Sequence, residues 1–267
     1  MTRIVCVQLA PRIGDVAANH RQIVRTIAET TAGGADILVL PELATSGYVF
    51  ESAAEAADCA IAPGDPMIGE WAAAVDGGSV VVCGYAERGP DGVLYNSAVL
   101  FDATGVLAQY RKTHLWDREK LFFTPGSHPP PVAETRFGRI AVMVCYDLEF
   151  PEYTRRVALD GADLIAVPTN WPEVPRPVGE RPPEVLLAQA AARVNRVAIA
   201  CCDRSGTERG QRWTEGTTIV DQDGWIAAVA GADGRAQWDT DLAAARDKTL
   251  SPRNHLFDDR RTELYGR

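Results

Sequence analysis

The sequence feature that most constrains the fold is an apolar run at residues 140–144 that ends abruptly at Cys145. Because its residues do not alternate between apolar and polar, the run predicts a strand buried on both faces. Polar and turn-forming residues follow, and Pro151 marks the expected start of a helix. Cys145 is therefore expected at the carboxyl end of a buried strand, where ligands bind in open α/β sheets. Taken alone, it is more simply explained as a small buried hydrophobic residue than as a nucleophile.

Strand-like and helix-like segments follow one another along the chain, which predicts an α/β fold. Strands are expected at residues 3–9, 37–40, 79–85, 94–101, 106–111, 163–167, 197–202, 216–220 and 225–229, and helices at 17–31, 52–58, 66–75, 151–160 and 184–194. Five prolines within residues 170–183 predict an irregular lid or binding loop. No linker-like stretch divides the chain, so residues 1–267 are expected to form one domain, whose two similar halves stack sheet on sheet.

Composition narrows the class of protein. Hydrophobic residues make up 46% and charged residues 24% of the 267, which is ordinary for a soluble globular protein. No apolar run approaches the ~20 residues of a membrane helix, and the N-terminus has no signal-peptide layout, so a cytoplasmic location is expected. A net charge of -9 argues against a nucleic-acid or anionic-membrane surface. The six cysteines form no Cys-x-x-Cys pair, which argues against zinc.

Three polar side chains stand just beyond three of the predicted strands. Glu42 lies two residues after the strand at 37–40, Lys112 directly follows the strand at 106–111, and Cys145 ends the focal strand. Each alone is more simply explained as a solvated charge or a packed thiol. Their matching positions indicate a shared site, because side chains at strand ends on one rim can meet.

The three groups could support nucleophilic catalysis without a histidine. A thiol with a pKa of about 8.5 needs a base or a cation beside it to react near neutral pH. A partly desolvated Glu42 would have the raised pKa that a general base needs. Lys112 would stabilise an oxyanion, as would a backbone N–H directly after the nucleophile.

Several motifs resemble those of the nitrilase superfamily, the carbon–nitrogen hydrolases. The family's glutamate motif is matched at residues 40–43 with 47–48, its lysine motif at 110–115, and its cysteine motif at 145–147 with 150–152. Residues 95–97, 123–126 and 263–265 also fit the pattern. The matches span nearly the whole chain in the family's order, whereas a lone Cys-Tyr-Asp would be a weak signal.

The resemblance implies a fold, a site and an assembly. The fold would be a four-layer αββα sandwich of two packed mixed sheets flanked by helices. The site would be a triad of Glu42, Lys112 and Cys145, with Glu119 in the position of a second glutamate that orients the lysine and the substrate nitrogen. It implies no metal and no organic cofactor. Family members pair through a helical surface, often with exchanged C-terminal tails, so a homodimer or larger homo-oligomer is expected.

The expected reaction is hydrolysis of a small, aliphatic amide, with release of ammonia and a thioester on Cys145. Family nitrilases tend to carry Cys-Trp-Glu at the nucleophile, whereas Cys-Tyr-Asp here is more similar to the amidase and carbamoylase branches. Hydrolysis of an N-carbamoyl amide is the second expectation, and nitrile hydrolysis is less favoured. A catalytically silent binding or assembly module and a redox role for Cys145 are the alternatives from other classes.

Four residues are expected to contact the substrate: Tyr146 through its backbone N–H, Glu149, Trp171 and Tyr48. Family members that act on acidic substrates often carry Arg where Glu149 stands, so a pocket-facing Glu149 would favour a neutral or cationic substrate. With equal weight, Glu149 instead pairs with Arg118 or Arg155. Trp171 and the loop after it are expected to form one pocket wall, and Tyr48 with Trp116 another. Residues 201–204 depart from a common Ala-Asn-Arg pattern, which puts the local hydrogen bonding in doubt.

Overall fold

The computed structural model describes residues 1–265, and its first large sheet has six strands in the order β14-β1-β2-β3-β4-β5. The strands are β1 (Thr2–Val7), β2 (Ile37–Val39), β3 (Val80–Arg88), β4 (Leu94–Asp102), β5 (Gly105–Arg111) and β14 (Arg235–Thr240). The central strands β1, β2 and β3 are parallel, and the other pairs are antiparallel. Helix α1 (Val16–Ala32) connects β1 to β2, which makes the predicted crossover unit.

The second sheet repeats this plan in the order β13-β12-β9-β8-β7-β6. Its strands are β6 (Val132–Thr135), β7 (Gly138–Val142), β8 (Leu164–Pro168), β9 (Ala198–Cys202), β12 (Thr218–Val220) and β13 (Ile226–Val229). Strands β7, β8 and β9 are parallel, and the outer pairs are antiparallel.

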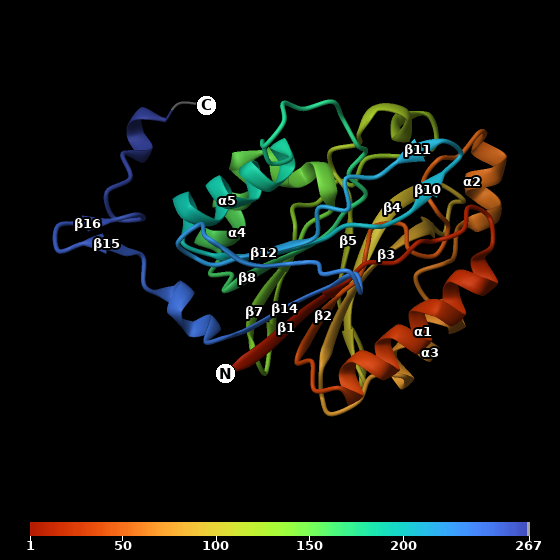
Figure 1. The fold of residues 1–267 in the computed structure, drawn as a ribbon, viewed down its shortest axis with the longest axis horizontal. Helices are drawn as coiled ribbons and strands as arrows, with labels where there is room; N and C mark the ends of the chain where they lie inside the picture. Colours follow the sequence, from red (N-terminus) through yellow and green to blue (C-terminus); the bar gives the residue numbers. More distant parts are fainter. Residues whose placement is uncertain (266–267) are drawn as a thin grey trace.

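Helices cover the outer face of each sheet, as Figure 1 shows. Helices α1, α2 (Ala53–Cys59) and α3 (Pro66–Ala73) pack on the first sheet, and α4 (Pro151–Leu159) and α5 (Pro183–Asn195) on the second. In β2, Val39 packs into the core between the sheets, whereas its neighbour Leu38 packs beneath the helices. Burial on both faces explains the absence of alternation in this strand. The predicted αββα sandwich is therefore confirmed.

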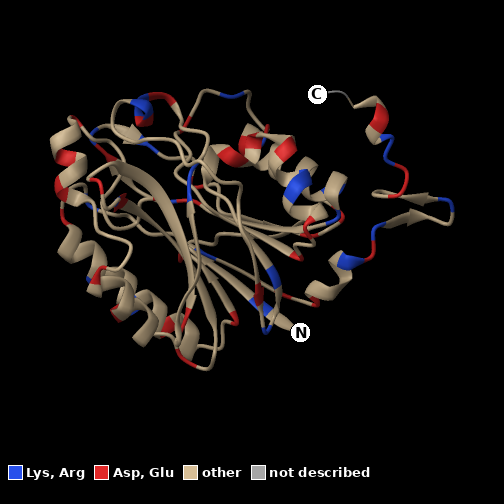
Figure 2. Cartoon of the chain, turned by 180° about the vertical axis from the view of Figure 1, so that it is seen from behind, with Lys and Arg blue, Asp and Glu red and all other residues tan. Residues whose placement is uncertain are grey.

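Charged residues lie mainly on the helices and connecting segments, while the strands are mostly uncharged (Figure 2). None of the helices within residues 1–265 combines the length and apolar character that crossing a membrane requires. The prediction of one domain stays a prediction, which the core shared by both sheets supports.

The structure corrects the boundaries near the expected site. The focal strand β7 ends at Val142, and Cys145 begins a short 3-10 helix, η2 (Cys145–Glu149). Strand β14 was not predicted, although its buried Ala236 and Thr240 alternate with exposed residues. It crosses back to the first sheet and pairs with β1, which no local pattern specifies.

Short elements complete the chain. They are η1 (Asp117–Leu121), the hairpin β10 (Thr207–Glu208) and β11 (Gln211–Arg212), η3 (Leu242–Arg246), the hairpin β15 (Thr249–Ser251) and β16 (Asn254–His255), and η4 (Thr262–Leu264). Residues 249–265, from β15 to η4, project away from the body (Figure 1). The predicted polar tail ends at residues 266–267, which lie outside the described part of the chain.

Candidate active site

Glu42 follows β2 in a tight loop and is fully buried. The next residue, Leu43, has a left-handed φ of 48°. Strand β3 passes directly beside this loop at Gly84, where a Cβ would lie 2.6 Å from the Glu42 Cα. From the second sheet, the Asn170 Nδ2 donates to the Glu42 backbone oxygen at 2.9 Å. These contacts fix the main chain that carries the carboxylate.

Lys112 follows β5 and is also fully buried. Its Nζ donates to Glu42 Oε1 and to Glu119 Oε1, each at 2.7 Å. Gly126 is needed beside it, because a Cβ there would overlap the Arg111 carbonyl. Lys112, Glu42 and Glu119 therefore form one buried ionic cluster, in which the ammonium bridges two carboxylates.

Cys145 has a left-handed φ of 48°, a conformation that is strained for a residue other than glycine. Asp147 holds this turn. Its Oδ2 accepts hydrogen bonds from the Val144 N–H at 3.3 Å and from the Tyr110 hydroxyl at 2.9 Å. Its Oδ1 accepts the His114 backbone N–H at 3.0 Å. Since Tyr110 and His114 flank Lys112 in sequence, the turn with the thiol is tied to the lysine segment.

Burial dominates the electrostatics of the cluster. Desolvation raises the pKa of Glu42 to about 7, against the lowering effect of Lys112. Burial alone would lower the pKa of Lys112, but Glu119 and Glu42 raise it well above its usual range. Burial, with the charge of Glu42, also raises the pKa of the Cys145 thiol. Near neutral pH the site therefore holds a protonated thiol, a charged lysine and a carboxyl group that can gain or lose a proton.

Two polar contacts of the cluster were missed in the sequence. The Asn96 Nδ2 donates to Glu42 Oε1 at 2.7 Å, and the Tyr48 hydroxyl donates to Glu119 Oε1 at 2.5 Å. Both residues lie within motifs that match the family pattern, and that was the only signal for them. Within residues 1–265, Oε2 of Glu42 and Oε2 of Glu119 are buried without a hydrogen-bond partner. Each carboxylate thus has one oxygen held and one oxygen free.

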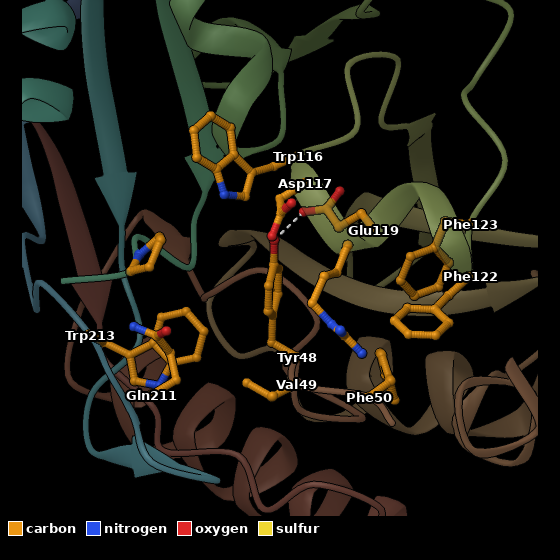
Figure 3. A pocket seen from close by; sticks show the side chains of 12 residues that line it. Tyr48, Val49, Phe50, Trp116, Asp117, Glu119, Phe122, Phe123, Gln211 and Trp213 are labelled. Atoms are coloured by element: carbon orange, nitrogen blue, oxygen red, sulfur yellow. Dashed lines mark hydrogen bonds between the residues drawn. The ribbon is translucent and has the colours of Figure 1, made fainter. Parts of the chain in front are cut away.

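A cavity of about 160 Å³ adjoins the cluster at Glu119, whereas Glu42, Lys112 and Cys145 are not among the residues that line it. Half of its lining residues are aromatic, and the charged Asp117, Arg118 and Glu119 also line it (Figure 3). The aromatic residues are Tyr48, Phe50, Trp116, Phe122, Phe123 and Trp213. Tyr48 and Trp116 both line this cavity, and their contact with the substrate stays a prediction. Trp171 does not line this cavity but is buried as part of the largest hydrophobic core cluster. Pro172 and Trp213 occupy the wall instead, joined by a β-bridge that the proline-rich loop makes with the chain after β11.

Glu149 ends η2 and is exposed. Neither arginine considered as its partner pairs with it: Arg118 lies over the Phe122 ring, and Arg155 donates to the Val194 carbonyl. Although its side chain reaches the surface, partial desolvation, followed by the nearby Glu184, raises the pKa of Glu149. The Tyr146 ring packs edge-on against Trp116, with centroids 4.9 Å apart.

The segment after β9, where the sequence departs from the family pattern, is held by hydrogen bonds to the Asp203 side chain. Asp203 accepts the backbone N–H groups of Trp171, Arg204 and Gly216, each at 2.9 Å. Cys201 and Cys202 are buried free thiols in the core.

Comparison with known proteins places this geometry among related enzymes. The profile described as "Carbon-nitrogen hydrolase" matches residues 3–247. The chain is similar to a nitrilase from Pyrococcus abyssi, with 36% identity over 275 residues that cover 100% of both chains. It is also similar to an N-carbamoylputrescine amidase from Arabidopsis thaliana, with 30% identity over 273 residues, 94% of this chain and 90% of the other.

Among solved structures, the fold is similar to a glutamate-to-glutamine variant of an amidase from Nesterenkonia sp. AN1. The TM-score is 0.79 at 30% identity, covering 99% of this chain and 98% of that one. That structure shows the result of Michael addition of acrylamide at the active-site cysteine.

Proposed function

The chain belongs to the carbon–nitrogen hydrolase family and is an amidase-type hydrolase; from this premise we propose that it hydrolyses small, aliphatic amides and releases ammonia through a thioester on Cys145. The observation that carries the proposal is the buried cluster of Glu42, Lys112 and Glu119 next to the strained turn of Cys145. Such a site brings together a base, a cation and a thiol, the groups that acyl transfer to sulfur requires.

In the first half-reaction, the Cys145 sulfur attacks the amide carbon while its proton passes to Glu42. The free Oε2 of Glu42 is the atom that can accept this proton. Lys112 and the Tyr146 backbone N–H hold the oxyanion. As the C–N bond breaks, Glu42 gives the proton to the leaving nitrogen and ammonia departs, leaving a thioester.

In the second half-reaction, Glu42 takes a proton from a water molecule whose oxygen attacks the thioester carbon. The C–S bond breaks, the acid product leaves, and the proton returns to the Cys145 sulfur. Glu119 keeps Lys112 in place throughout, and its free Oε2 is available to the substrate nitrogen. The amide and one water molecule are the only reactants in these steps.

The cavity supports a small, apolar acyl group. At about 160 Å³ it is smaller than the roughly 300–1,000 Å³ of sites for drug-sized ligands. Half of its lining residues are aromatic, and among the charged ones Asp117 and Glu119 outnumber Arg118. Glu149 with Glu184 adds further negative charge nearby. A substrate carboxylate would be repelled there, so we expect neutral or cationic amides.

Ammonia release from a panel of substrates tests the proposal. The panel contains neutral aliphatic amides, amino-amides, ω-amido acids, carbamoyl compounds and nitriles. We expect the highest kcat/KM for a neutral amide or an amino-amide, and a thioester mass on Cys145 in a quenched reaction. A Cys145→Ala variant that kept full amide hydrolysis would contradict the mechanism. Absence of both turnover and adduct would favour a silent binding module.

N-carbamoyl hydrolysis is the second candidate, and the similarity to an N-carbamoylputrescine amidase favours it. The same catalytic groups could break its C–N bonds, with carbon dioxide as a further product. Carbon dioxide release with a higher kcat/KM than for any amide in the panel would select this alternative.

A homodimer is part of the proposal. Helices α4 and α5 expose large apolar side chains at Leu159, Leu186, Leu187 and Val194. The projecting tail of Figure 1 could extend over a second copy. Light scattering coupled to size-exclusion chromatography should give twice the mass of 28.9 kDa or a larger multiple.

A further inference from the structure

The hairpin β10–β11 reaches across to the loop that carries Tyr48. Glu208, in β10, places its Oε1 against two consecutive peptide groups of that loop. It accepts the Tyr48 N–H at 2.8 Å and the Val49 N–H at 2.6 Å. Because charged acceptors make the stronger hydrogen bonds, a single carboxylate oxygen fixes this main chain.

The close approach depends on a glycine. Gly47 has a φ of 79°, and a Cβ built on it would lie 2.6 Å from Glu208 Oε2. Only glycine tolerates both this backbone conformation and such a close contact, so Gly47 provides the space that the Glu208 carboxylate occupies.

Arg204 holds the carboxylate from the other side. Its side chain is 1% exposed, and its Nη1 donates to Glu208 Oε2 at 2.9 Å. Its guanidinium carbon lies 4.6 Å from the centroid of the Trp213 ring, which packs edge-on against the Tyr48 ring with centroids 5.4 Å apart. Arg204 thus supports Tyr48 through both its main chain and its ring.

The other end of Tyr48 reaches the ionic cluster. Its hydroxyl donates to Glu119 Oε1, the oxygen that also accepts from Lys112 Nζ. The position of this shared oxygen depends on Tyr48. A shift of the Tyr48 main chain would therefore move the carboxylate that holds the lysine.

A purely structural role is the simpler explanation to be tested. Buried ion pairs stabilise a fold no better than well-packed apolar residues of similar volume. An apolar pair could not replace the Arg204–Glu208 pair in one respect. The Glu208 carboxylate accepts hydrogen bonds from the Tyr48 and Val49 backbone N–H groups.

We propose that Glu208, held by Arg204, is a positioning residue for the amide hydrolysis. It fixes the Tyr48–Val49 main chain so that the Tyr48 hydroxyl holds Glu119 against Lys112. The inference rests on the proposed function and adds a residue to it that does not line the cavity.

A double-mutant cycle tests whether Glu208 acts through Tyr48. We expect Glu208→Gln to lower kcat by about 10- to 100-fold while KM changes by less than about threefold, because misplaced catalytic groups affect the chemical step. In a Tyr48→Phe background, the same change should have less than about a threefold effect. Equal losses of kcat in both backgrounds, or a change in KM alone, would overturn the proposal.

Glu173→Gln is the matched control. Glu173 pairs with Arg212 of the same hairpin, at 3.0 Å and in an exposed position, and should leave kcat unchanged. If Glu208→Gln does not fold, Arg204→Lys replaces it in the cycle, since lysine keeps the charge but loses the forked geometry. A kcat loss that does not depend on Tyr48 would then reject the proposal.

Alkylation of Cys145 by iodoacetamide separates this inference from the proposed function. Cys145 is 6% exposed, more than the other five cysteines. Glu208→Gln should slow its alkylation at neutral pH, measured by mass spectrometry, and slow it less in the Tyr48→Phe background. If that occurs while the wild-type protein hydrolyses no compound of the panel, the proposed function fails, but the positioning of the cluster by Glu208 through Tyr48 is still supported. If the wild-type protein hydrolyses an amide but the losses in the cycle are additive, the function stands and the inference fails.

Discussion

Glu42 and Asp203 are both fully buried carboxyl groups, and burial raises the pKa of each to about 7. They differ in the hydrogen-bond partners of their oxygens. Asp203 accepts three backbone N–H groups through its two oxygens. Glu42 has Oε1 held by Asn96 and Lys112, and its Oε2 has no partner among residues 1–265. A raised pKa therefore does not distinguish these two carboxyl groups as candidate bases, whereas the unpaired oxygen does, because only Glu42 of the two has an oxygen free to take a proton.

The strongest test of this comparison is Glu42→Gln. The amide keeps an acceptor for Asn96 and Lys112 but cannot take a proton, so we expect kcat/KM to fall about 10³-fold or more. The melting temperature should change little, because the amide nitrogen can replace Oε2, which accepts no hydrogen bond among residues 1–265. Steady-state ammonia release and thermal denaturation measure the two effects. Retention of a tenth of the activity would exclude Glu42 as the base.

Asp203→Asn should have the opposite profile. In asparagine an NH2 group replaces one of the two oxygens that now accept backbone N–H groups. Donors would then face each other, and the unpaired buried donors cost about 1–3 kcal/mol. Urea denaturation should show this loss in the free energy of unfolding. The folded variant should keep far more activity than Glu42→Gln, and equal inactivation would show that the two carboxylates are not distinct in role.

The pH dependence sharpens the comparison further. If Glu42 must be ionised to act as a base, kcat/KM should fall about tenfold per pH unit below a midpoint near 7 and level off above it. The value of kcat/KM falls toward low pH because protonation of Glu42 removes the acceptor for the Cys145 proton. The same midpoint should appear in Asp203→Asn. A midpoint that moves or vanishes in this variant would assign the titration to Asp203.

Glu149, an exposed carboxylate, should give the smallest effect. Glu149→Gln removes one of two neighbouring negative charges, so hydrolysis of an ω-amido acid relative to a neutral amide should rise a few-fold, or about 0.5–1 kcal/mol. Glu152→Gln, in the first turn of α4, is the control. An unchanged ratio would place Glu149 outside substrate selection.

Local sequence patterns predicted most of the strands and helices of the two large sheets, because burial on both faces leaves a continuous apolar run, as at residues 140–144. The four-layer arrangement came from the family resemblance, and β6 and β14 were not predicted. They also placed Glu42, Lys112 and Cys145 at strand ends, and the family motifs added Glu119. The corrections arose where geometry is not local. The strained turn at Cys145 depends on Asp147, which the sequence gives no reason to direct toward Tyr110 and His114.

The sequence by itself determined which residue types could form a nucleophilic site and which segments would carry them. The tertiary structure alone decided their partners, because those partners come from distant segments: Lys112 and Glu42 are 70 residues apart, and Tyr48 and Glu208 are 160 apart. It selected Trp213 instead of Trp171 for the cavity wall and gave one of two similar buried carboxylates a free oxygen. Such contacts are set by how the two sheets pack, and packing is a property of the whole chain.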